Sequence, residues 1–224
     1  MRLKEMVGVV TGASGGTGPA VVTALQEACR AVVGVTRGRD VTWREVERGR
    51  FEAAADVLNE ASVAALVAEI RRHLGTCHVW INLVGGFTSS GVVEEASPGD
   101  WSRMLDLNFT SALNCCRQVV PVFKSQGFGR IINFGSVPGL EGMAGSGPYA
   151  VSKAAVTNLT CTLAAEGKDH GVTANVLIPT VIDTPANRKA MPGADVSRWI
   201  KPEAIAREIV SLIASSRTGE VIRL

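Results

Sequence analysis

The stretch GPYAVSKAAV places the only tyrosine of the chain, Tyr149, four residues before Lys153. Residues four apart share one face of an α-helix, so the phenol and the ammonium group would lie next to each other. A phenol with a pKa of about 10 exchanges protons poorly at neutral pH, and a nearby cation lowers that pKa by favouring the phenolate. The spacing predicts a tyrosine acid or base assisted by a lysine, although a buried structural tyrosine would fit the same residues.

A second candidate is the loop TGASGGTG at residues 11–18, between a strand-like run and a helical pattern. Glycines allow a tight turn and let backbone N–H groups approach a pyrophosphate, which then lies at the positive N-terminus of the helix. In this context the loop favours a dinucleotide-binding site. No Gly-Lys-Ser/Thr follows, so it is not a Walker loop.

The same loop leaves a competing interpretation open. Residues 12–16 match the GxSxG elbow of serine hydrolases, with Ser14 as the nucleophile. Such an enzyme needs a histidine later in the chain, and only His73, His78 and His170 are available. His170 stands in GKDHG, which is typical of a helix end and a turn, so the hydrolase is the weaker alternative.

The residues about 20 positions after a glycine loop indicate which dinucleotide is bound, because an acid there holds the ribose 2′-hydroxyl whereas arginine suits a 2′-phosphate. The sequence at 36–39 is TRGR, without an acid. Arg37 can form charge-assisted bonds to phosphate. We therefore expect NADP(H) rather than NAD(H).

The elements that position these residues alternate along the chain. Continuous apolar runs indicate strands at residues 6–11, 31–36, 51–57, 78–84, 130–135, 172–178 and in the final GEVIRL. Helical patterns cover residues up to 29 after the glycine loop, 61–74, 100–125, 149–168 and 202–214, and residues 37–50 are interpreted as a polar connection. The pattern predicts one α/β domain over residues 1–224, a Rossmann-like doubly wound parallel sheet of about seven strands with helices on both faces. Ligands of such sheets bind at the carboxyl ends of the strands.

Composition narrows the function classes. Hydrophobic residues make up 46% and charged residues 20% of the chain, and the net charge of +2 is scattered, so we expect neither disorder nor nucleic-acid binding. No apolar stretch reaches the roughly 18 residues of a membrane span, and no secretory signal is evident. Five cysteines without CxxC spacing and three scattered histidines predict free thiols, a cytoplasmic location and no metal site.

Further motifs follow in order: Asp56-Val57 after a strand, NLVG at 82–85, Asn108 in LDLNFTSA and Ser136 in NFGSVPG. Together with TGxxxGxG and the Tyr149–Lys153 pair, they resemble the short-chain dehydrogenase/reductase family over nearly the whole chain. The resemblance implies a catalytic tetrad of Asn108, Ser136, Tyr149 and Lys153. It implies nucleotide contacts from Gly12, Ser14, Gly16, Thr17, Gly18, Arg37, Asp56, Val57, Asn82, Val84, Gly85, Tyr149, Lys153, Pro179, Ile182 and Thr184.

The resemblance also implies roles for the tetrad. Tyr149 exchanges the proton of a carbonyl or alcohol, and Lys153 also holds the nicotinamide ribose. Ser136 bonds the reacting oxygen, and Asn108 orders a water that relays protons to the lysine. The substrate would be a small carbonyl or alcohol, and a homotetramer would form through the helices at 100–125 and 149–168.

Residues 179–201 resemble the substrate lid of dihydropteridine reductases, although Ser136 and Arg37 depart from that subgroup. Phe87, Met191 and Trp199 are candidates for an apolar pocket under this lid. A pterin reductase and a non-catalytic nucleotide-binding regulator therefore stay open as alternatives.

Overall fold

The chain forms one sheet with helices on both faces, as the alternating pattern predicts. The computed structural model describes all 224 residues. The strands are β1 (Val7–Thr11), β2 (Ala31–Arg37), β3 (Thr42–Glu47), β4 (Arg50–Ala55), β5 (Val79–Asn82), β6 (Gly129–Phe134), β7 (Val172–Ile178) and β8 (Val221–Arg223). They lie in the order β3-β4-β2-β1-β5-β6-β7-β8, and all except β3 pair in parallel. The predicted doubly wound sheet is confirmed, and its order reverses between β1 and β5.

The edge strand β3 is a feature that the sequence pattern does not predict. Within the expected polar connection, Thr42–Glu47 pairs antiparallel with β4. An edge strand can be charged on its solvent face, and this hides the apolar run that marks a central strand. Its anchor is Trp43, which stacks on His73 with ring centroids 4.6 Å apart and also packs against Phe51 at 5.2 Å.

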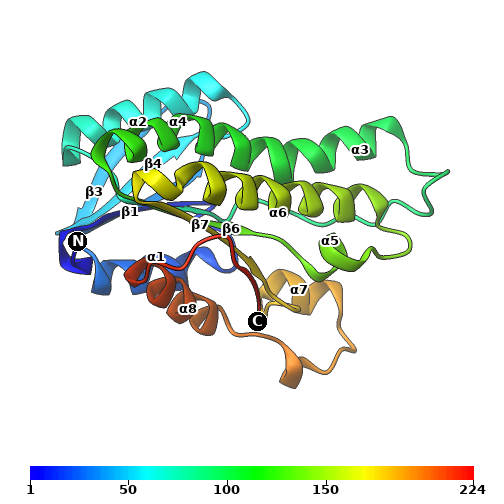
Figure 1. The fold of residues 1–224 in the computed structure, drawn as a ribbon. Helices are drawn as coiled ribbons and strands as arrows, with labels where there is room; N and C mark the ends of the chain where they lie inside the picture. Colours follow the sequence, from blue (N-terminus) through cyan, green and yellow to red (C-terminus); the bar gives the residue numbers. More distant parts are fainter.

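Helices cover the two faces of the sheet separately. They are α1 (Gly18–Ala28), α2 (Glu60–Leu74), α3 (Pro98–Met104), α4 (Ser111–Gln126), α5 (Val137–Glu141), α6 (Gly147–Gly167), α7 (Pro185–Ala190) and α8 (Pro202–Ala214). Figure 1 shows α2, α4 and α6 on one face and α1 and α8 on the other. Because successive strand residues point to opposite faces, Val9 lies in the core with α2 and α4, whereas Val10 lies in the core with α1 and α8.

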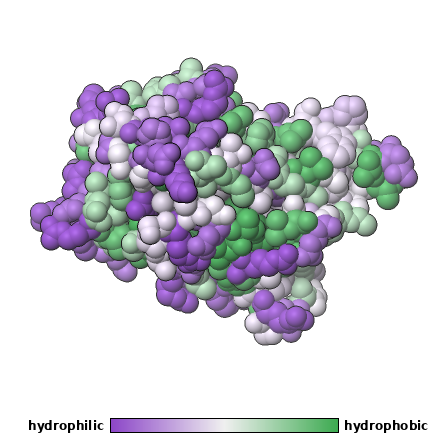
Figure 2. All heavy atoms as spheres, viewed as in Figure 1, coloured by the Kyte–Doolittle hydropathy of each residue, from purple (hydrophilic) through white to green (hydrophobic).

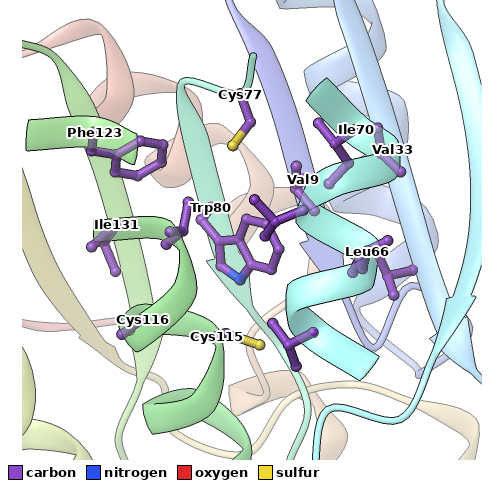
Figure 3. Packing of buried hydrophobic residues seen from close by; sticks show 14 of the residues in the cluster. Val9, Val33, Leu66, Ile70, Cys77, Trp80, Cys115, Cys116, Phe123 and Ile131 are labelled. Atoms are coloured by element: carbon purple, nitrogen blue, oxygen red, sulfur yellow. The ribbon is translucent and has the colours of Figure 1, made fainter. Parts of the chain in front are cut away.

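The core under α2 and α4 is centred on a tryptophan. Figure 3 shows Trp80 between the strands and these two helices, with Leu66 and Ile70 on one side and Cys115 nearby. All five cysteines are free, and burial raises the pKa of the Cys116 thiol to about 12. Cys115 and Cys116 therefore pack as small hydrophobic side chains, as expected.

The helix predicted over residues 100–125 is divided into three parts. Between α3 and α4, Leu105–Thr110 forms a π-helical segment that contains Asn108. A π turn inserts an extra residue and so rotates the following face, which simple helical periodicity does not reveal. The expected glycine-rich loop after β6 also contains a helix, α5, whose N-cap is Ser136.

The surface is mixed rather than uniformly polar. Figure 2 shows hydrophilic side chains concentrated toward the left end of the view, and hydrophobic areas toward the centre and right. No helix has the length and apolar character needed to cross a bilayer.

Candidate active site

A cavity of about 850 Å³ opens at the carboxyl ends of four parallel strands. Its lining comes from the segments after β1, β5, β6 and β7, which are residues 12–18, 83–87, 134–143 and 179–191, together with residues 149 and 153 on α6. These strands include the neighbours β1 and β5, where the strand order reverses. The cavity is therefore at the position where doubly wound sheets bind ligands.

The glycine loop fits closely against its surroundings. Gly12 has φ +70°, which favours glycine, and a Cβ at Gly18 would lie 2.2 Å from the carbonyl oxygen of Ala13. A Cβ at Gly16 would lie 2.6 Å from the Thr184 methyl carbon. Side chains at these positions would collide with the loop's own backbone or with Thr184, so the tight turn requires glycines, and such a turn lets backbone N–H groups approach a pyrophosphate.

Tyr149, Lys153 and Ser136 come together in this cavity. Tyr149 and Lys153 lie on the first turns of α6, and Ser136 lies two residues after the end of β6. The hydroxyl of Ser136 accepts a hydrogen bond from the backbone N–H of Gly139 at 3.1 Å. Lys153 Nζ donates to the carbonyl oxygen of Phe134 at 2.9 Å, which fixes the ammonium group at the end of β6.

The electrostatics differ from the sequence expectation. Burial raises the pKa of Tyr149 above its usual value of about 10, and the neighbouring Ser136 hydroxyl opposes this shift. Burial also lowers the pKa of Lys153 to about 8. The expected lowering of the phenol pKa by the lysine is therefore wrong for this structure, because desolvation of the phenol dominates. Burial therefore favours the protonated form of the Tyr149 phenol.

Asn108 reaches the cavity indirectly. Its Oδ1 accepts from the backbone N–H of Gly86 at 2.9 Å, and its Nδ2 donates to the Gly86 carbonyl at 3.0 Å and to Ser152 Oγ at 3.1 Å. A Cβ at Gly85 would lie 2.8 Å from Asn108 Oδ1 and 3.1 Å from Lys153 Nζ, so these two polar side chains approach the same glycine. The π segment thus turns Asn108 toward α6 and the loop after β5.

The predicted residues divide into two groups. Those that line the cavity are Gly12, Gly16, Thr17, Gly18, Gly85, Ser136, Tyr149, Lys153, Pro179 and Ile182. Those that do not line it are Ser14, Arg37, Asp56, Val57, Asn82, Val84, Asn108 and Thr184. Arg37 is exposed at the end of β2, and Val57 is buried in the core.

Asn82 serves a structural network at the end of β5. Its Oδ1 accepts from Trp80 Nε1 at 3.0 Å, and its Nδ2 donates to Asn133 Oδ1 at 2.8 Å. Asn133 in turn donates to Thr160 Oγ1 at 2.9 Å. This chain of buried polar groups joins β5, β6 and α6, so the Asn82 side chain positions the sheet behind the cavity rather than lining it.

The three candidates for the apolar pocket take different positions in the structure. Phe87 and Met191 line the cavity, whereas Trp199 is buried and does not line it, so its expected place in the pocket is wrong. An aromatic residue in a lid segment can serve either purpose, and nothing in its spacing distinguishes packing from substrate contact. Among the lining residues that the sequence patterns do not indicate are Val137, Pro138, Met143, Val181, Asn187 and Ala190. Their signal is their position in the loops after β6 and β7.

The histidines that a serine hydrolase would require lie elsewhere. His78 is buried and accepts the Val7 backbone N–H at 3.0 Å, and His73 stacks on Trp43. His170 follows α6 in a short 3-10 helix. None of the three lines the cavity.

Comparison with known proteins identifies the family. The model of the short chain dehydrogenase family matches residues 6–195. The chain belongs to this family. A 3beta-hydroxysteroid dehydrogenase of Mediterraneibacter gnavus is 32% identical over 98% of this chain and 86% of the relative. An acetoacetyl-CoA reductase of Shinella zoogloeoides is 30% identical over 95% of this chain and 92% of the relative.

Solved structures agree on the fold. A short-chain type dehydrogenase/reductase from Mycobacterium ulcerans superposes with a TM-score of 0.89, at 21% identity, over 100% of this chain and 90% of the other. As a short-chain dehydrogenase, the protein is an oxidoreductase that acts on CH–OH or carbonyl groups with a nicotinamide dinucleotide. This overturns the hydrolase and the non-catalytic regulator as alternatives.

Proposed function

We propose that this short-chain dehydrogenase reduces a carbonyl group of a small molecule with NADPH, or catalyses the reverse oxidation, and that Tyr149 is the acid/base. The observation that supports this most is the state of the phenol. Tyr149 lines the cavity, and burial raises its pKa, which favours the protonated phenol. A protonated group beside the reacting oxygen is what reduction requires.

The other residues of the site prepare this proton transfer. When bound, the nicotinamide dinucleotide supplies the hydride to the carbonyl carbon and is itself oxidised. The oxygen receives its proton from Tyr149, and Ser136 donates a hydrogen bond to the same oxygen as charge develops on it. Lys153, with its ammonium group held by the Phe134 carbonyl, stabilises the phenolate that remains and binds the ribose. Asn108 holds the Gly86 backbone in place. In this proposal it would also order a water that relays protons to Lys153.

Preference for NADPH rests on Arg37. The glycine loop lies beside β2, since the Ala13 backbone N–H donates to the Val35 carbonyl at 3.0 Å. Arg37 ends this strand with an exposed guanidinium. A 2′-phosphate at the edge of the loop would meet a free cation there, and no acid follows until Asp40.

The test is a titration of the protein with NADPH and with NADH, followed by tryptophan fluorescence. We expect NADPH to bind at least tenfold more tightly, and Arg37→Ala to remove most of this difference, since a charge-assisted bond contributes about 1.5–3 kcal/mol. Arg48→Ala, an exposed arginine in the turn between β3 and β4, is the matched control. Equal binding of both nucleotides by the unaltered protein would contradict the NADPH preference.

Three expectations about the whole protein belong to the same proposal. From Val151 to Thr162 the exposed positions of α6 are Val151, Ala154, Asn158, Cys161 and Thr162, none of them charged, which suits the expected homotetramer. Residues 179–201 would act as the substrate lid, and their likeness to dihydropteridine reductases stays a prediction. A cytoplasmic location rests on the cysteine content of the sequence.

A further inference from the structure

We propose that the substrate is an uncharged, largely apolar ketone, or the corresponding secondary alcohol, larger than a single six-membered ring, and that Phe87 and Met191 select it. This inference rests on the proposed function, because it concerns the same cavity. It follows from the scarcity of charged residues in the lining, from the exposed apolar side chains there and from the different chain segments that supply them.

The cavity offers no partner for a charged substrate. Among its lining residues only Lys153 carries a charge at neutral pH, and its ammonium group is buried against the Phe134 carbonyl. No aspartate, glutamate or arginine lines the cavity. A charged substrate group placed beside Tyr149, away from the glycine loop, would lose its hydration without gaining a counterion.

The cations of the lid are turned away from the cavity. On α7, Asn187 and Ala190 lie one helical turn apart on the same face, and they line the cavity together with Met191, which follows α7 directly. Lys189 falls on the opposite face and is exposed. Arg188 is held by Asp183, with Nε 2.5 Å from Oδ1. The lid therefore presents an amide and apolar groups to the substrate.

Large apolar side chains remain exposed around this cavity. Phe87 is 57% exposed, Met143 is 44% exposed, and Val181 and Met191 are each 37% exposed. Phe87 also packs edge-on against the Tyr149 ring, with centroids 5.0 Å apart and an interplanar angle of 82°. Apolar surface gathered beside a reacting group gains free energy when a ligand covers it. Phe87 thus places an apolar surface directly beside the proton donor.

The size of the substrate follows from where these residues originate. Phe87 follows β5, Met143 follows β6, and Val181 and Met191 follow β7. A fused-ring compound presents more apolar surface than a single six-membered ring and can cover side chains from more than one of these segments at once. Each additional buried methylene strengthens binding by about fourfold. A bulky apolar ketone is therefore favoured over a single ring.

Three ketones test the proposal with NADPH: 2-decalone, cyclohexanone and 4-oxocyclohexanecarboxylate. 2-Decalone and cyclohexanone differ in bulk, whereas cyclohexanone and 4-oxocyclohexanecarboxylate differ in one carboxylate. We expect kcat/KM for 2-decalone to exceed that for cyclohexanone at least tenfold, and cyclohexanone to exceed the charged ketone at least tenfold. A charged ketone that reacts as well as cyclohexanone, or a decalone no better than cyclohexanone, would overturn the inference.

Two variants test the selecting residues. Phe87→Ala and Met191→Ala should each raise KM for 2-decalone about tenfold, while KM for cyclohexanone changes less than threefold in Met191→Ala. Val93→Ala is the matched control, because Val93 is exposed on the loop that follows Phe87 and does not line the cavity. If neither variant changes the preference for 2-decalone, these residues do not select the substrate.

Binding is measured separately, by saturation-transfer NMR of 2-decalone with the protein and NADP⁺. Decalone that binds but is not reduced would contradict the proposed chemistry of Tyr149 and retain the apolar substrate class. Reduction of the charged ketone in preference to decalone would overturn the apolar substrate class and retain the proposed chemistry of Tyr149. Absence of decalone binding would overturn the inference.

Discussion

Two regions border the same cavity and are built in opposite ways. Around Tyr149 and Lys153 the polar groups are buried: Lys153 is 7% exposed and Asn108 is 1% exposed, and each has hydrogen-bond partners within the chain. The segment 183–200 is largely exposed and is tied mainly at its ends, where Asp183 N–H donates to the Ile200 carbonyl at 2.8 Å. Proton transfer needs groups fixed to within a fraction of an ångström, whereas substrate selection tolerates an adaptable surface.

The largest expected effect is at the buried cation. Lys153→Met should lower kcat by about 10²–10⁴-fold, since proton transfer loses its supporting charge. The free energy of unfolding at pH 7 should stay equal or rise, because an apolar side chain of similar size replaces a buried charge. Kinetics and urea unfolding check the two parts, and a loss of both activity and stability would show that the ammonium group is structural.

The same variant gives a linkage test. The pKa of Lys153 is about 8 in the folded protein and 10.5 in the unfolded reference, so the unfolded chain binds more protons between these values. The free energy of unfolding of the native protein, relative to that of Lys153→Met, should therefore rise by about 3 kcal/mol from pH 8 to pH 10.5. This gain is lost again as pH falls back through 8. A pH-independent difference would place the lysine in a less buried state.

The pH profile of reduction should show the next effect. Tyr149 stays protonated beyond its usual range, whereas Lys153 loses its proton above about pH 8. We expect kcat/KM to be flat from pH 6 to 8 and then to fall about tenfold per unit. A profile that remains flat to pH 10 would mean that the charge on the lysine is not required.

A smaller effect is expected at the residue that supports the site from the π segment. Asn108→Ala removes the side-chain partner of the Gly86 N–H and carbonyl groups, and Ser152 Oγ keeps only its bond to the Tyr149 carbonyl, so stability should fall by about 1–3 kcal/mol and kcat about tenfold. Thr110→Ala in the same segment is the control, since its side chain reaches only Asp106. Urea unfolding measures the stability of both variants, and steady-state kinetics measures kcat. Equal losses in the two variants would point to the π segment as a whole.

The smallest effect should come from the lid. Asp183→Asn weakens the ion pair with Arg188 on α7 and the ion pair with Lys201, which lies at the other end of this segment. We expect KM to rise a few-fold with kcat and Tm nearly unchanged. These cations hold the pKa of Asp183 far below its usual value, so the ion pairs should persist as pH falls to about 4 and be lost only when the carboxyl protonates. A fall in kcat instead of a rise in KM would tie Asp183 to the chemistry.

The sequence predicts best where local pattern and tertiary structure agree. Continuous apolar runs identify the central strands, and the spacing of Tyr149 and Lys153 identifies the pair on α6. The sign of the Tyr149 pKa shift depends on burial by distant segments such as Phe87, which no spacing reveals. The edge strand β3 is missed because Trp43 alone anchors it.

The sequence predicts least in the proposed lid. Its residues are exposed loops and one short helix, so their sequence carries little periodicity. Trp199 and Met191 look equally suited to a pocket, and only the fold places one in the core and the other at the cavity. Specificity is therefore less predictable from this sequence than reaction type.

The most direct test of the catalytic role is a single-turnover reduction by Tyr149→Phe preloaded with NADPH. The variant keeps the ring that packs against Phe87 and removes only the hydroxyl. If Tyr149 donates the proton, consumption of NADPH slows by about 10²–10⁴-fold while NADPH affinity and Tm are unchanged. A rate within threefold of the unaltered protein, at equal NADPH affinity, would contradict Tyr149 as the proton donor.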